Sequence, residues 1–349
     1  MQILAYGGNR PAPFQQGICE SQALEPGITA NYTVNAWAQT VALTACNAGN
    51  PNSESTLQCI RNLSLDTLLN ATVTEYQADG SNLGDIWLPA VDGDFLPAAP
   101  SELLASGRFS KVRAMFGWTQ NDATYFTDTS IATPNDTEAA IVSYLPNLNS
   151  TNLETLLSLY PITEFSATPS ANLSAEFYRS ARIVRDVLLA CEPMLLGHAL
   201  HSAGNDVYYY LQNQTILTPS LDASDHPGLG VIHTSELAYV FGDLSHFNIS
   251  GVVYEPKAED YVTRDRQSRS WSSFAAVGRP SVVGKDTLGG WEPAYQVGSK
   301  ETRLFVVNYA SGGLSALSGS GAKEAVAKQR LEERCAFINR ADVIKQVGF

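Results

Sequence analysis

The sequence predicts an α/β protein with a mainly parallel central sheet and flanking helices. Short apolar runs rich in β-forming residues alternate along the chain with longer segments of helical periodicity. The clearest strands are expected at 112–118, 206–211 and 304–307, and the clearest helices at 174–191 and 258–277. This alternation is typical of units in which a helix carries the chain back to begin the next parallel strand.

The other elements are predicted from shorter patterns. A short apolar run within residues 13–24 indicates a strand and its exit. Further helices are expected over 30–46, 62–76, 234–241 and 322–340. Residues 86–97 suggest a strand and a turn, because Asp92-Gly93 is a turn signal, and the Gly/Ser-rich residues 312–321 suggest a hinge. The segment 136–204 is helical in pattern, with breaks near Pro146, Pro161 and Pro169.

Composition limits the functions that the chain can have. It has 349 residues, of which 44% are hydrophobic and 16% charged, so a sizeable core can form. The net charge of −13 disfavours binding to nucleic acid or to anionic membrane surfaces. No apolar run approaches the roughly 18 residues that a membrane-spanning helix needs.

Two observations on secretion point in opposite directions. Residues 1–8 lack the basic and apolar regions of a signal peptide. Against this, the chain has an excess of Asn-x-Ser/Thr sequons over the roughly three that composition gives, which favours a glycosylated, secreted parent protein. The sequons are at Asn31, Asn62, Asn70, Asn135, Asn149, Asn172, Asn213 and Asn248.

The five cysteines leave at least one thiol without an intramolecular partner. Cys46 and Cys59 flank an Asn/Gly/Pro/Ser-rich stretch, as the ends of a disulfide-closed loop would. A disulfide closing so short a loop contributes about 3 kcal/mol in the chain-entropy model. The alternative is that both are buried, reduced thiols.

Four segments carry the motifs of one family. The first, LAYGG at 4–8 with Phe14 and Ile18 after it, resembles the helix end and strand that follow a nucleophile elbow. The second, WLPAVDG at 87–93, matches a W-x-P-x-x-D-G motif, and the third, GWTQNDA at 117–123, matches an acid loop. The fourth, GVIHTSEL at 230–237, matches a catalytic-histidine segment. In order and content the chain therefore resembles the C-terminal part of a type-B carboxylesterase/lipase (cholinesterase-like) protein.

This resemblance implies an α/β-hydrolase fold, with residues 1–349 as the C-terminal part of a single domain. It also implies the chemistry of a serine hydrolase of carboxylic esters, in which His233 is the base and Asp122 the acid that orients it. Ser21 is expected near the site but not as the nucleophile. Glu236 is either a supporting acid beside His233 or an ordinary acid in the first turn of a helix.

The sequence differs from the family pattern at two positions, and His233 and Asp122 also have non-catalytic interpretations. The family mostly has Glu where Asp122 stands and Gly where Ala123 stands, so Ala123 is strained if its φ is positive. Without the resemblance, His233 is a packed loop histidine and Asp122 a solvated acid or helix cap. The family pattern also implies a Cys191–Cys335 disulfide, which leaves Cys19 free.

No cofactor or metal is expected. His198, His201, His226 and His246 match no motif of the family, and no metal-ligand spacing such as H-E-x-x-H occurs.

The nucleophile motif G-x-S-x-G is absent from the 349 residues. Its nearest approximation, Gly319-Ser320-Gly321, has no strand before it and no strand-to-helix turn. The family's serine and oxyanion loop are expected before Met1, so this chain is expected to be a truncated product, inactive alone, with one sheet edge open. The ester substrate would belong to the full-length parent.

Two other classes of function remain open at this point. The chain could be a non-catalytic interaction protein, like the cholinesterase-like adhesion domains that keep the fold without the triad. It could also be an unrelated hydrolase with its own nucleophile.

Overall fold

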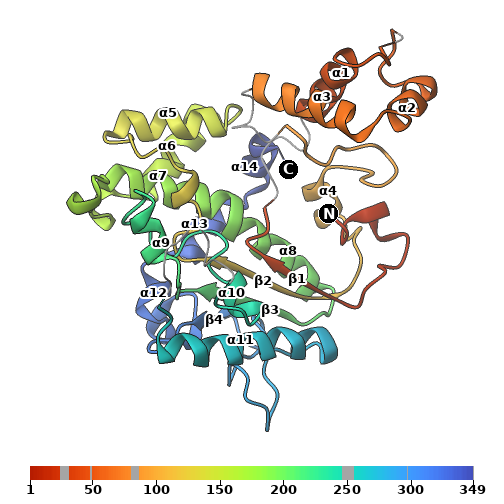
Figure 1. The fold of residues 1–349 in the computed structure, drawn as a ribbon. Coiled ribbons are helices and arrows are strands. Elements are labelled where there is room, and N and C mark those ends of the chain that lie inside the picture. The colour runs from red at the N-terminus through yellow and green to blue at the C-terminus, as the bar shows by residue number, and fades with distance from the viewer. Residues whose placement is uncertain (24–30, 48, 80–85, 246–254, 297, 349) are drawn as a thin grey trace.

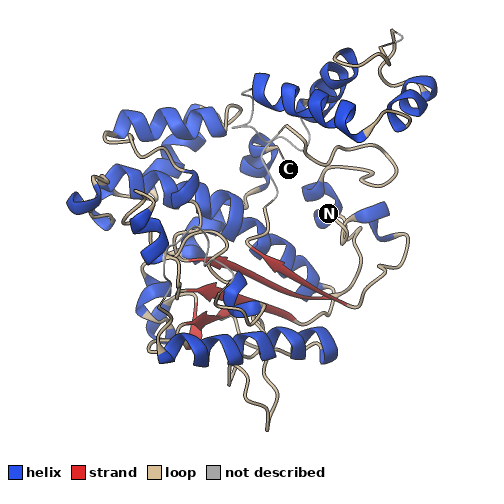
Figure 2. Ribbon diagram, viewed as in Figure 1, coloured by secondary structure: helices blue, strands red, loops and turns tan. Residues whose placement is uncertain are grey.

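A five-stranded sheet forms the centre of the molecule (Figure 2). The computed structural model describes residues 1–23, 31–47, 49–79, 86–245, 255–296 and 298–348. The strand order is β1-β2-β3-β4-β5; β1 to β4 are parallel and β5 pairs antiparallel with β4. The strands are β1 Gln16–Glu20, β2 Arg113–Thr119, β3 Val207–Gln212, β4 Arg303–Val307 and β5 Gly313–Ala316. The predicted α/β class with a mainly parallel sheet is confirmed.

Fourteen helices are described around this sheet. The first seven are α1 Tyr32–Ala42, α2 Glu54–Arg61, α3 Leu65–Ala78, α4 Pro100–Ala105, α5 Pro134–Tyr144, α6 Ser150–Ser158 and α7 Ala175–Arg185. The others are α8 Cys191–Ser202, α9 Thr218–Ala223, α10 Leu237–Val240, α11 Ala258–Val277, α12 Glu324–Ala327, α13 Leu331–Ile338 and α14 Ala341–Val347. None of the described helices is long and apolar enough to cross a bilayer.

The sheet is buried on both faces, as parallel sheets are. Alternate residues of β3 point to opposite sides: Tyr209 belongs to the larger core, with α7, α8 and α13, while Tyr210 packs in a second core with Trp271 and Phe274 of α11. Figure 1 shows α11 along one side of the sheet and α7, α8 and α13 on the other. Both central strands, β2 and β3, are therefore enclosed by helices.

The first strand, β1, differs from the central strands. Among the described strands it pairs only with β2, and each of its residues is half-buried. A cavity of about 320 Å³ lies beside it, lined by Leu4, Gln16, Cys19 and Glu192 among others. The predicted open edge is thus the edge formed by β1.

Helices α1, α2 and α3 form a separate layer at one end of the molecule (Figure 1). The Cys46–Cys59 disulfide closes the connection from α1 to α2, as the sequence predicts. Helix α2 was not predicted, because its residues were interpreted as part of the polar loop. It begins at Ser53, whose hydroxyl accepts a hydrogen bond from the Thr56 amide and so caps the helix.

Residues 86–97 do not form the predicted strand. The Thr33 hydroxyl of α1 donates to the carbonyls of Ile86 and Leu88, so this backbone bonds a side chain instead of a neighbouring strand. The turn at Asp92-Gly93 is present: Gly93 has φ +81° and Asp92 Oδ1 accepts from the Leu96 amide.

The C-terminal region departs from prediction in two places. The expected hinge at 312–321 contains β5, which the backbone of β4 holds in place. The single helix expected at 322–340 is two helices, α12 and α13, because Arg330 between them adopts a left-handed φ of +47°. By contrast, α11 has the predicted bounds: Asp260 caps its start and Gly278, with φ +71°, ends it.

Candidate functional site

The residues predicted for the site meet where the parallel strands end. Ser21 directly follows β1, Asp122 lies three residues after β2, and His233 lies in the long connection after β3. The carboxyl ends of β1, β2 and β3 lie at the same edge of the sheet because these strands are parallel. Residues from segments more than 100 positions apart therefore come into contact.

Asp122 is fully buried and accepts three hydrogen bonds. Its Oδ1 lies 2.7 Å from His233 Nδ1. Its Oδ2 accepts from the Ser21 hydroxyl at 2.7 Å and from the Thr119 amide at 2.8 Å. Three donors around one carboxyl group fix its orientation. This environment excludes a solvated loop acid.

His233 is oriented by this contact. The carboxylate of Asp122 requires the proton of the neutral imidazole to be on Nδ1, which leaves Nε2 as the proton acceptor. The hydrogen bond to Asp122 raises the pKa of His233 above its usual value, and partial burial opposes this shift. The side chain is 31% exposed and the Phe126 ring packs edge-on against it. The His233 side chain is thus half-buried: Asp122 binds its Nδ1, and its Nε2 is available as a proton acceptor.

The acid loop and the histidine loop are joined by a second set of contacts, centred on Val231. The Val231 carbonyl accepts from the Asn121 amide at 2.9 Å and from the Thr119 hydroxyl at 2.7 Å. In return, the Val231 amide donates to Asn121 Oδ1 at 3.1 Å. A Cβ at Gly230, which has φ +76°, would lie 2.4 Å from Asn121 Oδ1. The close approach of the two loops therefore requires glycine at position 230.

Backbone strain is concentrated at the same place. Ser21 and Thr234 have φ of +50° and +70°, which cost energy for residues other than glycine. Ala123, in contrast, has φ −95°, so the strain considered from the sequence does not arise there.

Glu236 is buried beneath the histidine, with 2% of its surface exposed. Burial, reinforced by the charges of Asp122 and Glu20, raises its pKa to about 8. Its Oε2 has no hydrogen-bond partner among the described residues. The raised pKa favours the uncharged form of Glu236 near neutral pH. Glu236 directly precedes α10, as expected for an acid at the start of a helix, and it is buried there.

Glu20, which sequence analysis did not single out, lies close to Glu236. Burial raises its pKa as well, and its Oε1 accepts a 2.5 Å hydrogen bond from the Trp271 indole. Its neighbour Cys19 is the free cysteine, and burial raises the pKa of its thiol to about 12. A thiol with so high a pKa is not a nucleophile at neutral pH.

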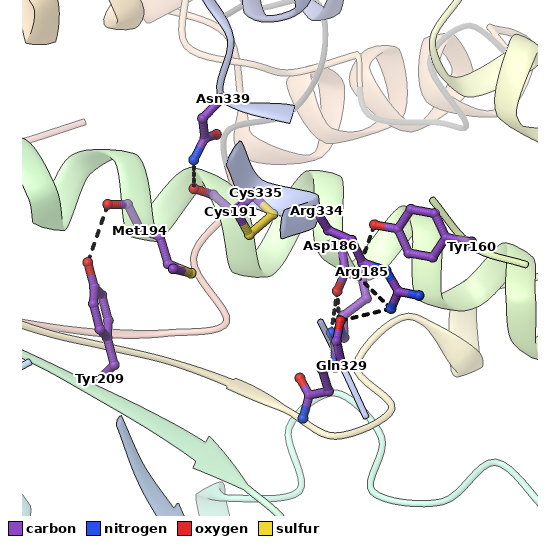
Figure 3. Close-up of a disulfide and its surroundings, with 10 residues drawn as sticks. All are labelled: Tyr160, Arg185, Asp186, Cys191, Met194, Tyr209, Gln329, Arg334, Cys335 and Asn339. Carbon is purple, nitrogen blue, oxygen red and sulfur yellow. Dashed lines mark hydrogen bonds and ion pairs between the residues drawn. A yellow bond between two sulfur atoms is a disulfide. The ribbon is translucent and has the colours of Figure 1, made fainter. Parts of the chain in front are cut away.

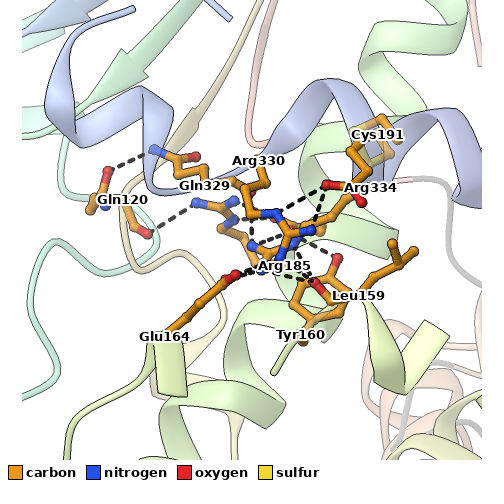
Figure 4. Close-up of polar contacts among 12 residues, drawn as sticks. Gln120, Leu159, Tyr160, Glu164, Arg185, Cys191, Gln329, Arg330 and Arg334 are labelled. Atoms are coloured by element: carbon orange, nitrogen blue, oxygen red, sulfur yellow. Dashed lines mark hydrogen bonds and ion pairs between the residues drawn. A yellow bond between two sulfur atoms is a disulfide. The ribbon is translucent and has the colours of Figure 1, made fainter. Parts of the chain in front are cut away.

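Three further residues that hold the site were not found from the sequence. Thr119 and Asn121 join the loops, and Arg185 donates to the Gln120 carbonyl at 3.2 Å (Figure 4). Their contacts are with residues 65 to 112 positions away. The GWTQNDA segment was the available signal, but no local pattern shows what its polar side chains bind.

The remaining predicted residues lie apart from this site. The Cys191–Cys335 disulfide is present between α8 and α13 (Figure 3). His198 and His201 lie against Tyr295, and His226 packs near Tyr125. Among the described histidines, cysteines and acids, no group of three could hold a metal ion.

Seven of the eight sequons lie in the described parts of the chain. Asn213 is half-buried and the other six asparagines are exposed, namely Asn31, Asn62, Asn70, Asn135, Asn149 and Asn172. Asn248 and His246 lie outside the described residues.

Comparison with known proteins relates this geometry to a family. The sequence profile of the Carboxylesterase family matches residues 7–337. A secreted lipase of Arthroderma benhamiae is 44% identical over the whole chain, which covers 61% of that protein. An inactive carboxylesterase-like protein, VdtD, of Byssochlamys spectabilis is 28% identical over 96% of the chain, and 59% of its own length is covered.

The fold resembles the crystal structure of EstA of Aspergillus niger, with a TM-score of 0.72 and 19% sequence identity. The match covers the whole chain and 62% of EstA. The chain therefore spans about three fifths of the length of these relatives.

Proposed function

The chain belongs to the carboxylesterase family, and from that premise we propose that it is the acid- and base-bearing part of a serine hydrolase of carboxylic esters. The observation that carries the proposal is the 2.7 Å contact between His233 Nδ1 and the fully buried Asp122. It leaves Nε2 of His233 unprotonated and facing away from the acid. That is the arrangement a general base needs.

In the proposed reaction, the nucleophile is a serine supplied by sequence that precedes this chain in the parent protein. His233 Nε2 takes the serine proton while the serine oxygen bonds to the ester carbonyl carbon. The imidazolium then gives that proton to the leaving alkoxide, and an acyl-enzyme remains. A water molecule, deprotonated in the same way, releases the carboxylic acid and restores the serine. Asp122 stabilises the imidazolium in both halves of the cycle.

Ser21 and Glu236 have supporting roles in this proposal. The Ser21 hydroxyl fixes Oδ2 of Asp122, so that Oδ1 faces the histidine. The raised pKa of Glu236 limits the negative charge that this buried side chain places near the imidazole at neutral pH. A negative charge there would raise the pKa of His233 further and leave less of the imidazole unprotonated at neutral pH.

By itself, this chain is not expected to hydrolyse esters. We propose that the nucleophilic serine and the oxyanion hole, which acyl transfer and its intermediate need, belong to the preceding part of the parent protein. The purified chain is therefore expected to leave p-nitrophenyl butyrate intact and to take up no fluorophosphonate. Labelling of any residue in this chain would overturn the proposal in favour of a hydrolase with its own nucleophile.

A second candidate is a non-catalytic, carboxylesterase-like protein that acts by binding a partner. The similarity to VdtD, which is named as inactive, favours this alternative. The two candidates differ over the longer protein: a serine in G-x-S-x-G encoded in frame before Met1 supports the esterase, and another residue in its place supports the binding protein.

We further propose that the parent protein is secreted and glycosylated. The relative of Arthroderma benhamiae is a secreted lipase, and six sequon asparagines are exposed. Expression through a secretory pathway followed by treatment with an endoglycosidase should lower the mass of the protein. An unchanged mass would contradict this proposal.

A further inference from the structure

Gln120, the residue between β2 and the acid loop, has polar contacts on three sides. Its amide donates to the Gln212 carbonyl at 3.0 Å, at the end of β3. Its carbonyl accepts from Arg185 Nη1 at 3.2 Å, and its side-chain Oε1 accepts from Gln329 Nε2 at 2.9 Å (Figure 4). Two of the three contacts therefore come from side chains outside the sheet. Both side chains belong to the layer that carries the Cys191–Cys335 disulfide.

Gln329 is an unusual residue to find in this place. It lies in the short connection between α12 and α13 and is 0% exposed. The next residue, Arg330, has the strained φ of +47°, and its guanidinium is paired with Glu164 and Glu333. Strain persists where the surroundings impose it. Here the strained turn directs the Gln329 amide inward, toward Gln120.

The connection that carries Gln329 is held rigidly from the other side. Arg334 donates to the Gln329 carbonyl at 2.8 Å and lies over the Tyr160 ring, with 3.9 Å between guanidinium carbon and ring centroid. The next residue, Cys335, forms the disulfide to Cys191, and Figure 3 shows the two features side by side. The end of the chain is thus fixed to α8 within a few residues of Gln329.

Arg185 reaches Gln120 from a similarly constrained position. Residues 186–190 are π-helical, and Arg185 just before them is bound through Nε and Nη2 to Asp186 Oδ1. Asp186 Oδ2 accepts from the Tyr160 hydroxyl at 2.9 Å. Arg185 and Asp186 are both fully buried, so each charge is compensated by the protein and not by solvent, and breaking the pair would be strongly destabilising.

We infer that Gln329 and Arg185 are positioning residues for Asp122, so that the C-terminal helices, and not only the sheet, set the geometry of the acid–histidine pair. They act through Gln120, which precedes Asp122 by two residues, so that the backbone of Asn121 connects the two. This inference rests on the proposed function for its catalytic meaning, because only an active site requires the pair to be held closely.

The test compares two buried glutamines that bind different strand ends. Gln329 donates to Gln120 Oε1 at 2.9 Å, and Gln267 of α11 donates to Gln212 Oε1 at 3.0 Å. Both are 0% exposed, and both have an Oε1 without a partner among the described residues. Gln267→Met removes one side-chain hydrogen bond, and Gln329→Met removes two, because Gln329 Nε2 also donates to the Ala325 carbonyl at 2.8 Å. Both substitutions preserve volume. Gln120→Met removes the Gln120–Gln329 bond and leaves the Ala325 contact in place.

The readout is the His233 imidazole in the 349-residue chain, followed by ¹⁵N-histidine NMR and identified by its loss in His233→Ala. In Gln329→Met the pKa of His233 should fall toward its ordinary value. The low-field NMR signal of the proton on His233 Nδ1 should also lose intensity. Gln267→Met should leave both unchanged. The inference would be overturned if the His233 pKa and Nδ1 signal stayed unchanged in Gln329→Met, or if they changed equally in Gln329→Met and Gln267→Met.

A second variant removes the same hydrogen bond from its other end. Gln120→Met replaces a half-buried loop side chain and should shift His233 in the same direction as Gln329→Met. The double variant should shift His233 no further than the single ones, because each of them already lacks the Gln120–Gln329 bond. Additive shifts would show that the residues act independently and would contradict the inference. None of these measurements needs turnover, so an inactive parent protein would remove the esterase proposal without affecting this result.

Discussion

Ser21 Oγ and His233 Nδ1 are bound to the two different oxygens of one carboxyl group, that of Asp122, at 2.7 Å each. The hydroxyl and the ring hold the carboxyl plane from both ends, and burial removes competition from water. This arrangement fixes which tautomer His233 adopts.

Asp122→Asn should lower the pKa of His233, because the largest cause of its elevation is the hydrogen bond to this carboxylate. A raised histidine pKa stabilises the fold fully below the ordinary value of about 6.5 and loses this effect as pH rises through the raised value. The variant should therefore be destabilised more at pH 5 than at pH 9, by about 1–3 kcal/mol at the lower pH. Urea unfolding at the two pH values measures this. Asp222→Asn on the surface of α9 is the control, and an equal loss at both pH values would count against the pairing.

Gly230→Ala should separate the acid and histidine loops, because its Cβ would lie 2.4 Å from Asn121 Oδ1. Gly284 is a matched control: it has φ +79°, close to the +76° of Gly230, and no atom within 4 Å of its Cβ position. Gly284→Ala should cost about 1 kcal/mol for its backbone. Gly230→Ala should cost about 1–3 kcal/mol more, from the steric contact. Equal losses in denaturant unfolding would show that the loops do not depend on this approach.

Glu236→Gln should stabilise the protein at high pH. Its folded-state pKa of about 8 lies above the ordinary carboxyl value, so the stability that comes from its neutral form is complete below about pH 4.3 and declines as pH rises toward 8. The amide stays neutral at every pH. The melting temperature of the variant should therefore equal that of the parent near pH 4 and exceed it at pH 9. A variant less stable at pH 9 would show that Glu236 is needed as a carboxylate.

The two disulfides should differ in their contribution to stability. Cys46–Cys59 closes a separation of 13 residues and Cys191–Cys335 one of 144. In the chain-entropy model these loops correspond to about 3 and about 5 kcal/mol. Paired Cys→Ala variants compared by urea unfolding measure the difference. The prediction is contradicted if removing Cys46–Cys59 lowers the free energy of unfolding more than removing Cys191–Cys335 does.

Sequence patterns predicted the elements whose signals are local. Helix α11 was predicted with its bounds, and β2 and β3 to within a residue, because periodicity and β-forming composition act within each segment. Strand β5 was not predicted, since its glycine and serine residues have little β-propensity and hydrogen bonds from β4 hold it. The break at Arg330 was missed as well: its side chain pairs with Glu164, 166 positions away, and no local pattern shows this contact.

The site residues also differ in how far the sequence predicted them. His233 and Asp122 were chosen because the motifs around them resemble those of a family, and the structure brings them within 2.7 Å. Asn121 was within the same motif but had no evident role, since its partner Val231 is 110 positions away. The uncharged state of Glu236 depends on burial, which no sequence pattern reveals.

The central claim is that His233, held by Asp122, acts as the base for a serine that is not in these 349 residues. The most direct measurement is fluorophosphonate labelling and p-nitrophenyl butyrate hydrolysis by two proteins: this chain, and the product of a coding sequence extended upstream of Met1. We predict that only the longer protein is labelled, on a serine in G-x-S-x-G, and that His233→Ala abolishes its labelling and turnover. Labelling of the 349-residue chain, or an active longer protein that is indifferent to His233→Ala, would contradict the account.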